Sequence, residues 1–453
     1  MYRLLRVGFV AALAAVGGAG CSEFLSDVAA DPNNPGAATR DQLFTAVQAG
    51  QFGQQEAAVA QVVCMWMQQC SGVGGRFVDQ RGKYNFTPID FSFDFTSVYI
   101  GGGLIDLRNI EASADADGAK VYAAIARIWE ALVIGTAADV WGDIPYREAA
   151  GSESHPHLDP QMQVYSDIQA LLDKAIADLA GSSAGPGGHD LVYGGDKTKW
   201  TAAAYTLKAR YRMHTAQVLG SAAYDAAIAA ATNGISAAAN DARAFHTSAT
   251  QEANIWYQFS TTAFGQDIVA GKALVDLMNV RNDPRLPQYF GKNALGGYGG
   301  DDLNGATPAD QVSPLAGARN APDFRQPLVT WMENQLILAE AKFVRSGAAT
   351  AQPHLDAVRA SLGLASVPTT LQSIMEEKYV AMFQNIEAWS DYKRTCLPAL
   401  VPHATTLYQN KIPGRVYYGS SEQNANPNIP DESAQLATGG VGFRNPNDPA
   451  PCP

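Results

Sequence analysis

The feature that most constrains this chain is a long apolar helix that ends in a glycine–proline turn. Apolar side chains recur at helical spacing through residues 121–140. The pattern stops in V-W-G-D-I-P-Y, residues 140–146, where Gly142 can adopt a positive φ. Pro145 disfavours a helical conformation of the residue before it. The stretch therefore predicts a helix followed by a stiff turn flanked by aromatic residues.

Two carboxylates, Asp139 and Asp143, bracket this turn. Taken alone, they could form an acid/base pair. They could also accept hydrogen bonds from backbone N–H groups that the helix end leaves free. We expect the structural role, in which the turn fixes how one helical hairpin meets the next.

Further apolar patterns of helical period predict a mainly α fold. Asp159 followed by Pro160 is typical of a helix start, with Asp as the N-cap. Short loops separate the predicted helices, which indicates hairpins of roughly 30 residues without a clean repeat. Besides the helix above, helices are predicted over residues 42–69, 94–112, 160–179, 200–219, 224–231, 268–280, 328–345, 354–362 and 371–392.

Two segments lack this period and are predicted to be loops. Residues 72–88 are rich in Gly and aromatic residues, and residues 241–324 combine Gly clusters, Pro turns and aromatics around one short helix. Loops of this length inside a compact fold are typically functional or poorly ordered. The C-terminal tail is rich in Pro and Asn, and we expect it to be irregular.

Composition and charge exclude several classes of protein. Apolar residues make up 47% of the chain and charged residues 17%, so a large core is possible. The formal net charge is −12, from 44 acidic and 32 basic residues, and no Lys/Arg cluster occurs. We therefore expect no nucleic-acid partner and no binding to anionic lipid head groups through a basic surface.

The N-terminus has the pattern of an export signal. Arg3 and Arg6 precede an apolar run that is too short to span a bilayer, and small residues lead into Cys21. These small residues resemble a bacterial lipobox, in which Cys21 is acylated, although Gly18 stands where Leu is commoner. An ordinary secretory cleavage site is the alternative. The predicted organisation is a signal peptide (1–20), a lipid tether (21–30) and a single helical domain (31–453).

Four cysteines remain after Cys21, and an exported protein can pair them. A continuous helix would hold Cys64 and Cys70 about 9 Å apart, which is too far for a disulfide. The two could pair only if the helix ended between them. Cys396 with Cys452 would tie down the tail. Both pairings stay open from the sequence.

The motifs of the chain resemble those of the SusD/RagB family. A-D-V-W-G-D-I-P-Y-R-E-A, residues 138–149, is similar to the family signature. The same order of further motifs follows through nearly the whole mature chain, particularly as in the SusD-like subgroup. These motifs are D-P-N-N-P (31–35), D-P-R-L (283–286), Q-L-I-L-A-E-A (335–341), E-K-Y-V-A-M-F (377–383), E-A-W-S-D-Y-K-R-T (387–395) and R-V-Y-Y-G-S-S-E-Q-N (415–424). Cys396 departs from the pattern, because a small residue such as Gly is expected there.

The resemblance implies a fold of tetratricopeptide-like helical hairpins with long irregular loop insertions. It also implies a lipoprotein of the outer membrane, anchored through Cys21 and facing the cell exterior. Such a protein binds a nutrient ligand, which we expect to be a glycan or oligosaccharide, and delivers it to a SusC-like TonB-dependent transporter. The alternative is an exported glycan hydrolase whose helical scaffold carries two carboxylates across a cleft. No constellation of residues indicates catalysis.

Ligand recognition is expected on the loops, because the apolar stripes of the helices must be buried. By side-chain type, aromatic rings would stack on sugar faces and polar groups would bind hydroxyls. The predicted binding residues are Arg76, Phe77, Tyr84, Trp256, Tyr257, Tyr298 and Asp302. No cofactor is predicted, although Asp301, Asp302 and Asn304 could supply oxygen ligands to calcium.

Overall fold

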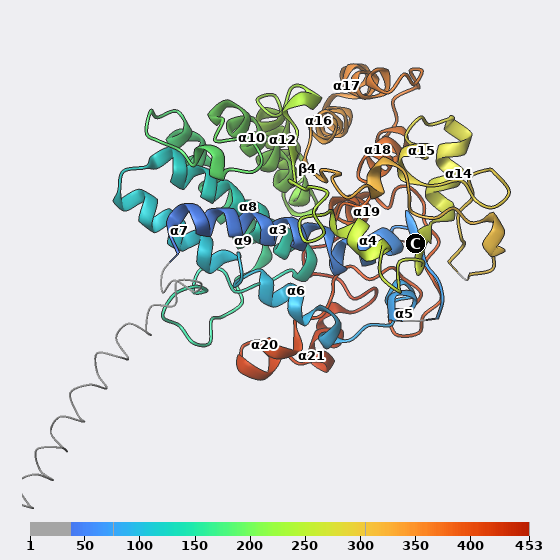
Figure 1. Cartoon of the computed structure of the whole chain (residues 1–453), viewed down its shortest axis with the longest axis horizontal. Helices are drawn as coiled ribbons and strands as arrows, with labels where there is room; N and C mark the ends of the chain where they lie inside the picture. Colours follow the sequence, from blue (N-terminus) through green and yellow to red (C-terminus); the bar gives the residue numbers. More distant parts are fainter. Residues whose placement is uncertain (1–37, 76, 304, 453) are drawn as a thin grey trace, which may run out of the picture. The chain divides into compact units, whose positions relative to one another are not determined.

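The signature stretch forms helix α8 (Lys120–Trp141) in the computed structural model, which describes residues 38–75, 77–303 and 305–452 (Figure 1). Every residue of α8 after Lys120 except Thr136 is buried, as expected for a largely apolar helix in the core. Gly142 ends the helix at a φ of 82°, and a Cβ there would lie 2.3 Å from Asn445 Oδ1. Both the backbone conformation and the lack of space therefore require glycine.

The predicted mainly α fold is confirmed. In Figure 1, α7 lies beside α8, and the packing continues from α8 to α9, α10, α12 and α16, which carries α17 and α18. The α-helices other than α8 are α3 (Arg40–Glu56), α4 (Ala58–Trp66), α5 (Phe77–Gly82), α6 (Ser92–Ser97), α7 (Leu104–Ala116), α9 (Gln161–Leu179), α10 (Lys197–His214), α11 (Ala216–Leu219), α12 (Ser221–Ala231), α13 (Ile255–Ser260), α14 (Lys272–Arg281), α15 (Leu286–Tyr289), α16 (Trp331–Ser346), α17 (Ala348–Ser361), α18 (Leu371–Ala381), α19 (Glu387–Thr395), α20 (Ser420–Ala425) and α21 (Glu432–Gly439). Short 3-10 helices are η1 (Pro88–Phe91), η2 (Gly187–His189), η3 (Ala238–Asn240), η4 (Ala309–Gln311) and η5 (Ala318–Asn320).

The length and apolar composition of α8 would fit a membrane-spanning helix as well as a core helix. Among the described residues it is the one helix long and apolar enough to cross a bilayer, and 94% of its most apolar window is buried inside the protein. Residues 44–453 form one compact unit. The predicted ends of the signal peptide and the tether, and Cys21 itself, lie outside the described residues.

Several predicted helices are broken in the structure. The helix predicted over 42–69 is α3 and α4, and the one predicted over 371–392 is α18 and α19, with Gln384 at a φ of 62° between them. The glycines at 101–103 separate α6 from α7, since Gly101 and Gly102 take positive φ values. The helix predicted over 200–219 divides likewise into α10 and α11, and the loop 72–88 contains α5.

Two short antiparallel ribbons connect distant parts of the chain. β2 (Ala242–Arg243) pairs with β4 (Pro327–Val329), so the irregular segment leaves and rejoins the helical scaffold at one place. β1 (Cys70–Gly72) pairs with β3 (Ile268–Ala270). The helix predicted over residues 268–280 is therefore wrong at its start, where β3 precedes α14.

The turn after α8 uses its carboxylates in a way that the sequence did not fully indicate. Asp143 Oδ1 accepts a hydrogen bond from the backbone N–H of Gln161 at 2.8 Å, so Asp143 caps α9 across the turn. Asp159, the predicted N-cap, instead accepts the N–H groups of Tyr146 and Arg147. The Asp139 carboxylate contacts the side chains of Tyr165 and His214, and no backbone N–H of the described residues donates to it, so that part of the prediction is wrong.

Both cysteine pairs form disulfides. Cys64 lies in the last turn of α4 and Cys70 begins β1, and their Cα atoms are 5.2 Å apart because the helix ends at Trp66. Cys396 follows α19 and pairs with Cys452 in the tail, with a Cα separation of 5.3 Å. The pairings that the sequence left open are therefore both present.

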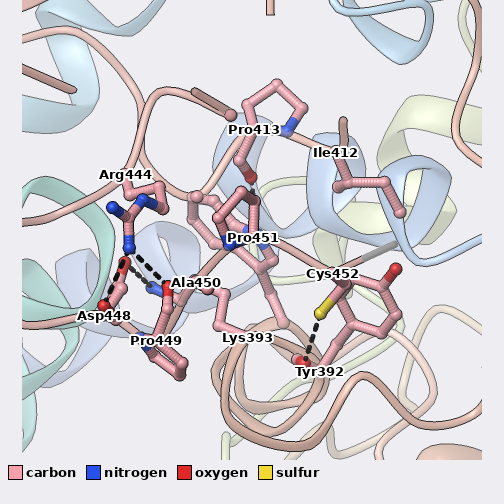
Figure 2. A pocket seen from close by; sticks show the side chains of 13 residues that line it. Tyr392, Lys393, Ile412, Pro413, Arg444, Asp448, Pro449, Ala450, Pro451 and Cys452 are labelled. Atoms are coloured by element: carbon pink, nitrogen blue, oxygen red, sulfur yellow. Dashed lines mark hydrogen bonds and ion pairs between the residues drawn. The ribbon is translucent and has the colours of Figure 1, made fainter. Parts of the chain in front are cut away.

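The C-terminal tail is largely irregular, with α20 and α21 as its helices, and it packs on the scaffold. Figure 2 shows a crevice between tail residues and α19, where the indole of Trp389 donates a hydrogen bond to the carbonyl of Pro413 at 2.9 Å. The crevice holds only about 20 Å³, which is room for about one water molecule. The indole of Trp141 likewise donates to the carbonyl of Tyr417. The Tyr418 hydroxyl donates to the carbonyl of Asp143 at 2.6 Å, so the tail covers the signature turn.

Candidate functional site

A cleft of about 320 Å³ lies where the β1–β3 ribbon meets the loop at residues 299–303. Its volume is at the lower end of the range for small-molecule sites. The cleft is formed by the irregular segment 241–324, by the residues directly before the predicted loop 72–88, and by two residues that follow α19. We call it the Asp302 cleft. Its lining residues are Gln68, Cys70, Ser71, Gly271, Lys272, Ala273, Asp301, Asp302, Leu303, Ala399 and Val401.

Backbone hydrogen bonds attach the 299–303 loop to the end of β3. The N–H of Asp301 donates to the carbonyl of Ala270 at 2.8 Å, and the N–H of Lys272 donates to the carbonyl of Asp301 at 2.9 Å. This approach requires Gly300, because a Cβ there would lie 2.4 Å from the backbone of Lys272. The chain therefore passes close enough to bring both carboxylates to the ribbon.

Two adjacent carboxylates give the cleft its polar character. Asp301 is nearly buried, and its Oδ2 accepts a hydrogen bond from the Ser71 hydroxyl at 2.7 Å. Burial raises the pKa of the Asp301 carboxyl, the Ser71 hydroxyl acts against that shift, and the nearby Asp302 adds to it. Asp302 is only partly buried, and its Oδ1 accepts the N–H of Ala306 at 3.0 Å.

The other side of the cleft combines a cation with apolar surface. The Lys272 ammonium lies 2.6 Å from Asp276 Oδ2, and both side chains are more than half exposed. Gln68 donates to the carbonyl of Val401 at 2.7 Å, which holds the rim in place. The side chain of Val401 is exposed, and Leu303 is partly buried. Carboxylate, ammonium and aliphatic groups together suit a ligand that carries both hydroxyls and apolar faces.

The predicted binding residues do not form one group in the structure. Asp302 lines the cleft, and Tyr298 lies in the same stretch of loop, where it is partly buried. Tyr257 is partly buried in α13 and does not line the cleft. Arg76 and the side chain of Phe77 lie outside the described part of the structure.

Two predicted rings are core residues, which corrects their assignment to a ligand surface. Tyr84 is 1% exposed, and its ring packs edge-on against Trp66 at a centroid distance of 5.9 Å. Trp256 is fully buried in α13, where Asn254 caps the helix by accepting its N–H at 2.9 Å. A ring that is already covered by protein cannot stack on a sugar. Their aromatic side chains suggested ligand recognition, but both rings instead pack the loops onto the helices.

Sequence reasoning missed Gln68, Ser71, Lys272 and Val401. Ser71 and Asp301 are 230 residues apart, so only the fold brings them together. The glycines at 271 and 300 were the available signal, because a close approach of two backbones needs them. The residues that these glycines contact could not be named without knowing that β1 pairs with β3.

A second cavity, of about 270 Å³, lies between α3 and residues 245–258, near the start of the irregular segment 241–324. Phe52 and Phe245 line it together with Gln251, Glu252 and Gln258. The guanidinium of Arg325 lies 4.5 Å from the centroid of the Phe245 ring. At its base, His246 Nε2 lies 2.7 Å from Glu56 Oε1. Of the predicted binding residues whose side chains the structure describes, none lines this cavity.

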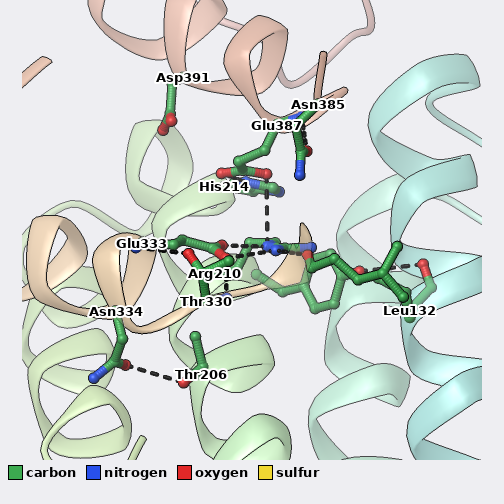
Figure 3. Close-up of polar contacts among 12 residues, drawn as sticks. Leu132, Thr206, Arg210, His214, Thr330, Glu333, Asn334, Asn385, Glu387 and Asp391 are labelled. Carbon is green, nitrogen blue, oxygen red and sulfur yellow. Dashed lines mark hydrogen bonds and ion pairs between the residues drawn. The ribbon is translucent and has the colours of Figure 1, made fainter. Parts of the chain in front are cut away.

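A buried network of ion pairs connects the signature motif (138–149) with the motifs at 377–395. Figure 3 shows its part around Arg210, His214, Glu333 and Glu387. His214, at the end of α10, lies 2.7 Å from Asp139 Oδ1 and 3.0 Å from Glu387 Oε1. Arg210, one turn earlier, donates two hydrogen bonds to Glu333 on α16. Lys378 is fully buried and lies 2.8 Å from Asp391. The network therefore binds α8, α10, α16, α18 and α19 together.

The charges in this network fix one another's protonation. Burial alone would lower the pKa of His214, but the Asp139 and Glu387 carboxylates outweigh burial and raise that pKa to about 9. Burial would raise the pKa of Glu387, but His214, Lys378 and Arg210 hold it well below its usual range. The histidine is therefore a cation between two carboxylates at neutral pH.

The spacing of Asp139, His214 and Glu387 would also suit a metal ion, since their ligand atoms lie within 4.8 Å of one another. However, Glu387 already has cationic neighbours, with Lys378 Nζ at 3.5 Å and Arg210 Nε at 3.8 Å. These cations would repel a divalent metal. We therefore assign the three residues to the scaffold.

Solved structures with the same fold are similar along nearly their whole length. A chitin-binding protein has 21% sequence identity and a TM-score of 0.75, covering 91% of this chain and 100% of its own. A SusD/RagB family protein from Bacteroides thetaiotaomicron has 20% identity and a TM-score of 0.72, with 90% and 97% covered. A chitin-binding SusD homolog from Flavobacterium johnsoniae has 20% identity and a TM-score of 0.74, with 89% and 96% covered. At these identities the likeness shows the fold.

Sequence comparison identifies the family. No curated protein matches the chain. The SusD-like family that is described as "Starch-binding associating with outer membrane" matches residues 32–419. Since this match covers most of the 453 residues, the chain belongs to the SusD-like family, as its motifs indicated.

Proposed function

We propose that the protein binds a glycan or oligosaccharide in the Asp302 cleft, at the cell surface, and delivers it to a SusC-like TonB-dependent transporter of the outer membrane. The observation that carries the proposal is the cleft itself, with its carboxylates, amide, ammonium and exposed aliphatic rim. Sugar hydroxyls bind such polar groups, and the C–H faces of the rings pack on apolar side chains. The family description and the chitin-binding relatives support this ligand class.

The binding proposal is tested by calorimetry with the purified chain. N-acetylglucosamine oligomers are the first probes, because two similar structures are described as chitin-binding, and starch oligomers follow. We expect Asp302→Asn to weaken binding about tenfold, since charged hydrogen bonds contribute about 1.5–3 kcal/mol. Asp310→Asn is the matched control, because Asp310 is exposed in the same insertion and does not line the cleft. Equal affinity in both variants would place the ligand elsewhere.

Binding without turnover is part of the proposal. The neighbours of similar structure are described as binding proteins. One carboxylate of the cleft, Asp301, is engaged by the Ser71 hydroxyl, and it is adjacent in sequence to the other rather than across the cleft from it. Oligosaccharide incubated with the protein should keep its length when analysed by chromatography. Shortened products would instead support the exported hydrolase.

The proposed anchoring and delivery have separate tests. Cys21→Ser should move the protein from the membrane fraction to the soluble fraction, and protease added to intact cells should degrade the wild-type protein if it faces outward. Delivery predicts that the protein co-purifies with a large TonB-dependent transporter from detergent-solubilised membranes. Calcium at the Asp301–Asp302 loop also remains a prediction, and glycan affinity measured with and without a chelator tests it.

A further inference from the structure

We propose that the Cys64–Cys70 disulfide is a positioning element of the Asp302 cleft, holding β1 against α4 in the arrangement that binds ligand. The consequence for binding rests on the proposed function, but the positioning itself does not. Cys70 lines the cleft, and Cys64 belongs to a helix whose last five residues are all buried. The disulfide therefore joins the wall of the cleft to the core.

The wall needs such an anchor because the ribbon is very short. β1 and β3 have three residues each, and a two-stranded ribbon of this size is marginal without support. Between α4 and β1 the chain reverses through Met67, Gln68 and Gln69, with Gln68 at a φ of 53°. Tyr379 holds the turn by donating its hydroxyl to the carbonyl of Met67 at 2.7 Å. The disulfide adds a covalent link at the first residue of the strand.

Movement of this turn would be transmitted directly to the cleft. The N–H of Gly271 donates to the carbonyl of Gln69 at 3.0 Å. A Cβ on Gly271 would lie 2.3 Å from the carbonyl oxygen of Gln68. The turn is therefore already in contact with Gly271, which lines the cleft. On the strand itself, Ser71 holds the Asp301 carboxylate by the 2.7 Å hydrogen bond. A shift of β1 therefore displaces both Gly271 and the Asp301 carboxylate.

The second disulfide provides a matched control. Cys396 and Cys452 do not line the cleft, and they are 56 positions apart in sequence instead of six. Ala399 and Val401 at the rim follow Cys396 in sequence. However, the N–H of Cys396 donates to the carbonyl of Tyr392 at 2.8 Å, so we expect Cys396 to keep its place at the end of α19 without the bond. Loss of this disulfide should loosen the tail and leave the cleft in place.

Amide hydrogen exchange of the ligand-free protein tests the positioning. The variants are C64S/C70S and C396S/C452S, compared with wild type well below their melting temperatures. We expect exchange at the amides of Lys272 and Asp301 to rise about tenfold in C64S/C70S, because both amides depend on the ribbon. In C396S/C452S those two amides should exchange as in wild type. A rise confined to residues 67–72 would overturn the proposal, because the disulfide would then act only locally.

Calorimetry with the glycan bound best by wild type tests the consequence. We expect about tenfold weaker affinity in C64S/C70S and less than twofold change in the control, because loss of preorganisation weakens binding. Unchanged affinity in a folded C64S/C70S variant would contradict the inference. A wild-type protein that binds no glycan would reject the proposed function, while the exchange comparison would still decide the positioning. If C64S/C70S does not fold, reducing agent added to C396S/C452S opens the same bond for both measurements.

Discussion

The buried ion-pair network and the Asp302 cleft belong to the same fold but differ in almost every property. In the network, side chains such as His214 and Glu387 are about 3% exposed and each contacts several opposite charges. In the cleft, the Lys272 side chain is more than half exposed, and the Val401 rim is open to solvent. The network is fixed by many mutual contacts, whereas the cleft depends on two short strands and a loop.

This difference shows what the recognisable motifs do. Asp139 comes from the signature around residue 142, and Lys378, Glu387 and Asp391 come from the motifs at 377–395, and all four lie in the network. A residue removed from such a network leaves a buried charge without its partner, so few substitutions are tolerated. No cleft residue is part of those motifs. The motifs therefore identify the scaffold, and under the proposed function the choice of ligand depends on residues outside them.

The largest expected effect is on the scaffold. Glu387→Gln keeps the shape of the side chain but leaves His214, Lys378 and Arg210 without a shared anion. We expect the free energy of unfolding to fall by about 3–5 kcal/mol in urea denaturation. Glu376→Gln is the control, because Glu376 is partly exposed on α18 and should change stability by less than about 0.5 kcal/mol. Similar losses in both variants would remove the distinction between network and surface.

Much of the scaffold follows from sequence, and the cleft does not. The period of α8 and its end at Gly142 are local signals, and both were predicted correctly. Three-residue strands carry too little alternation to be recognised, so β1 was missed and β3 was taken for the start of α14. The Ser71–Asp301 contact depends on that pairing. Aromatic type alone placed Tyr84 and Trp256 on a ligand surface, because burial of a loop residue is decided by tertiary packing.

The second effect is a pH dependence that belongs to the scaffold. The pKa of His214 is about 9 in the folded protein and near 6.5 when unfolded, so the folded state favours the proton. Its stabilising contribution is complete below pH 6.5 and is lost as pH rises through 9. We expect the free energy of unfolding to drop by about 3 kcal/mol over that window, measured with urea at several pH values. A flat profile would show that His214 is not held as a cation.

A smaller effect is expected at the signature turn that contains Pro145. Pro145→Ala should lower the free energy of unfolding by about 1 kcal/mol, because Pro restricts the unfolded chain and its φ suits the turn. Glycan affinity should be nearly unchanged, since the turn is covered by the tail and does not line the cleft. Melting temperature and calorimetry measure the two quantities separately. A large affinity loss with unchanged melting would place the ligand at the signature instead.

The smallest effect on stability is expected at the two predicted rings that stay partly exposed. Tyr298→Ala and Tyr257→Ala should each change the free energy of unfolding by less than about 0.5 kcal/mol, because both residues stay partly exposed.

The effects of these two substitutions on ligand binding should differ. Tyr298 is three residues from Asp301 in the same loop, so a long oligosaccharide that extends beyond the cleft can reach it, whereas Tyr257 lies in α13. By analogy with aromatic stacking on bases, we expect Tyr298→Ala to cost at least about 1 kcal/mol of binding free energy for long oligomers and less for short ones. Calorimetry with oligomers of increasing length distinguishes the two rings. A loss of affinity in Tyr257→Ala alone would move the proposed site to the second cavity, because the sequence neighbours of Tyr257, Ile255 and Gln258, line it.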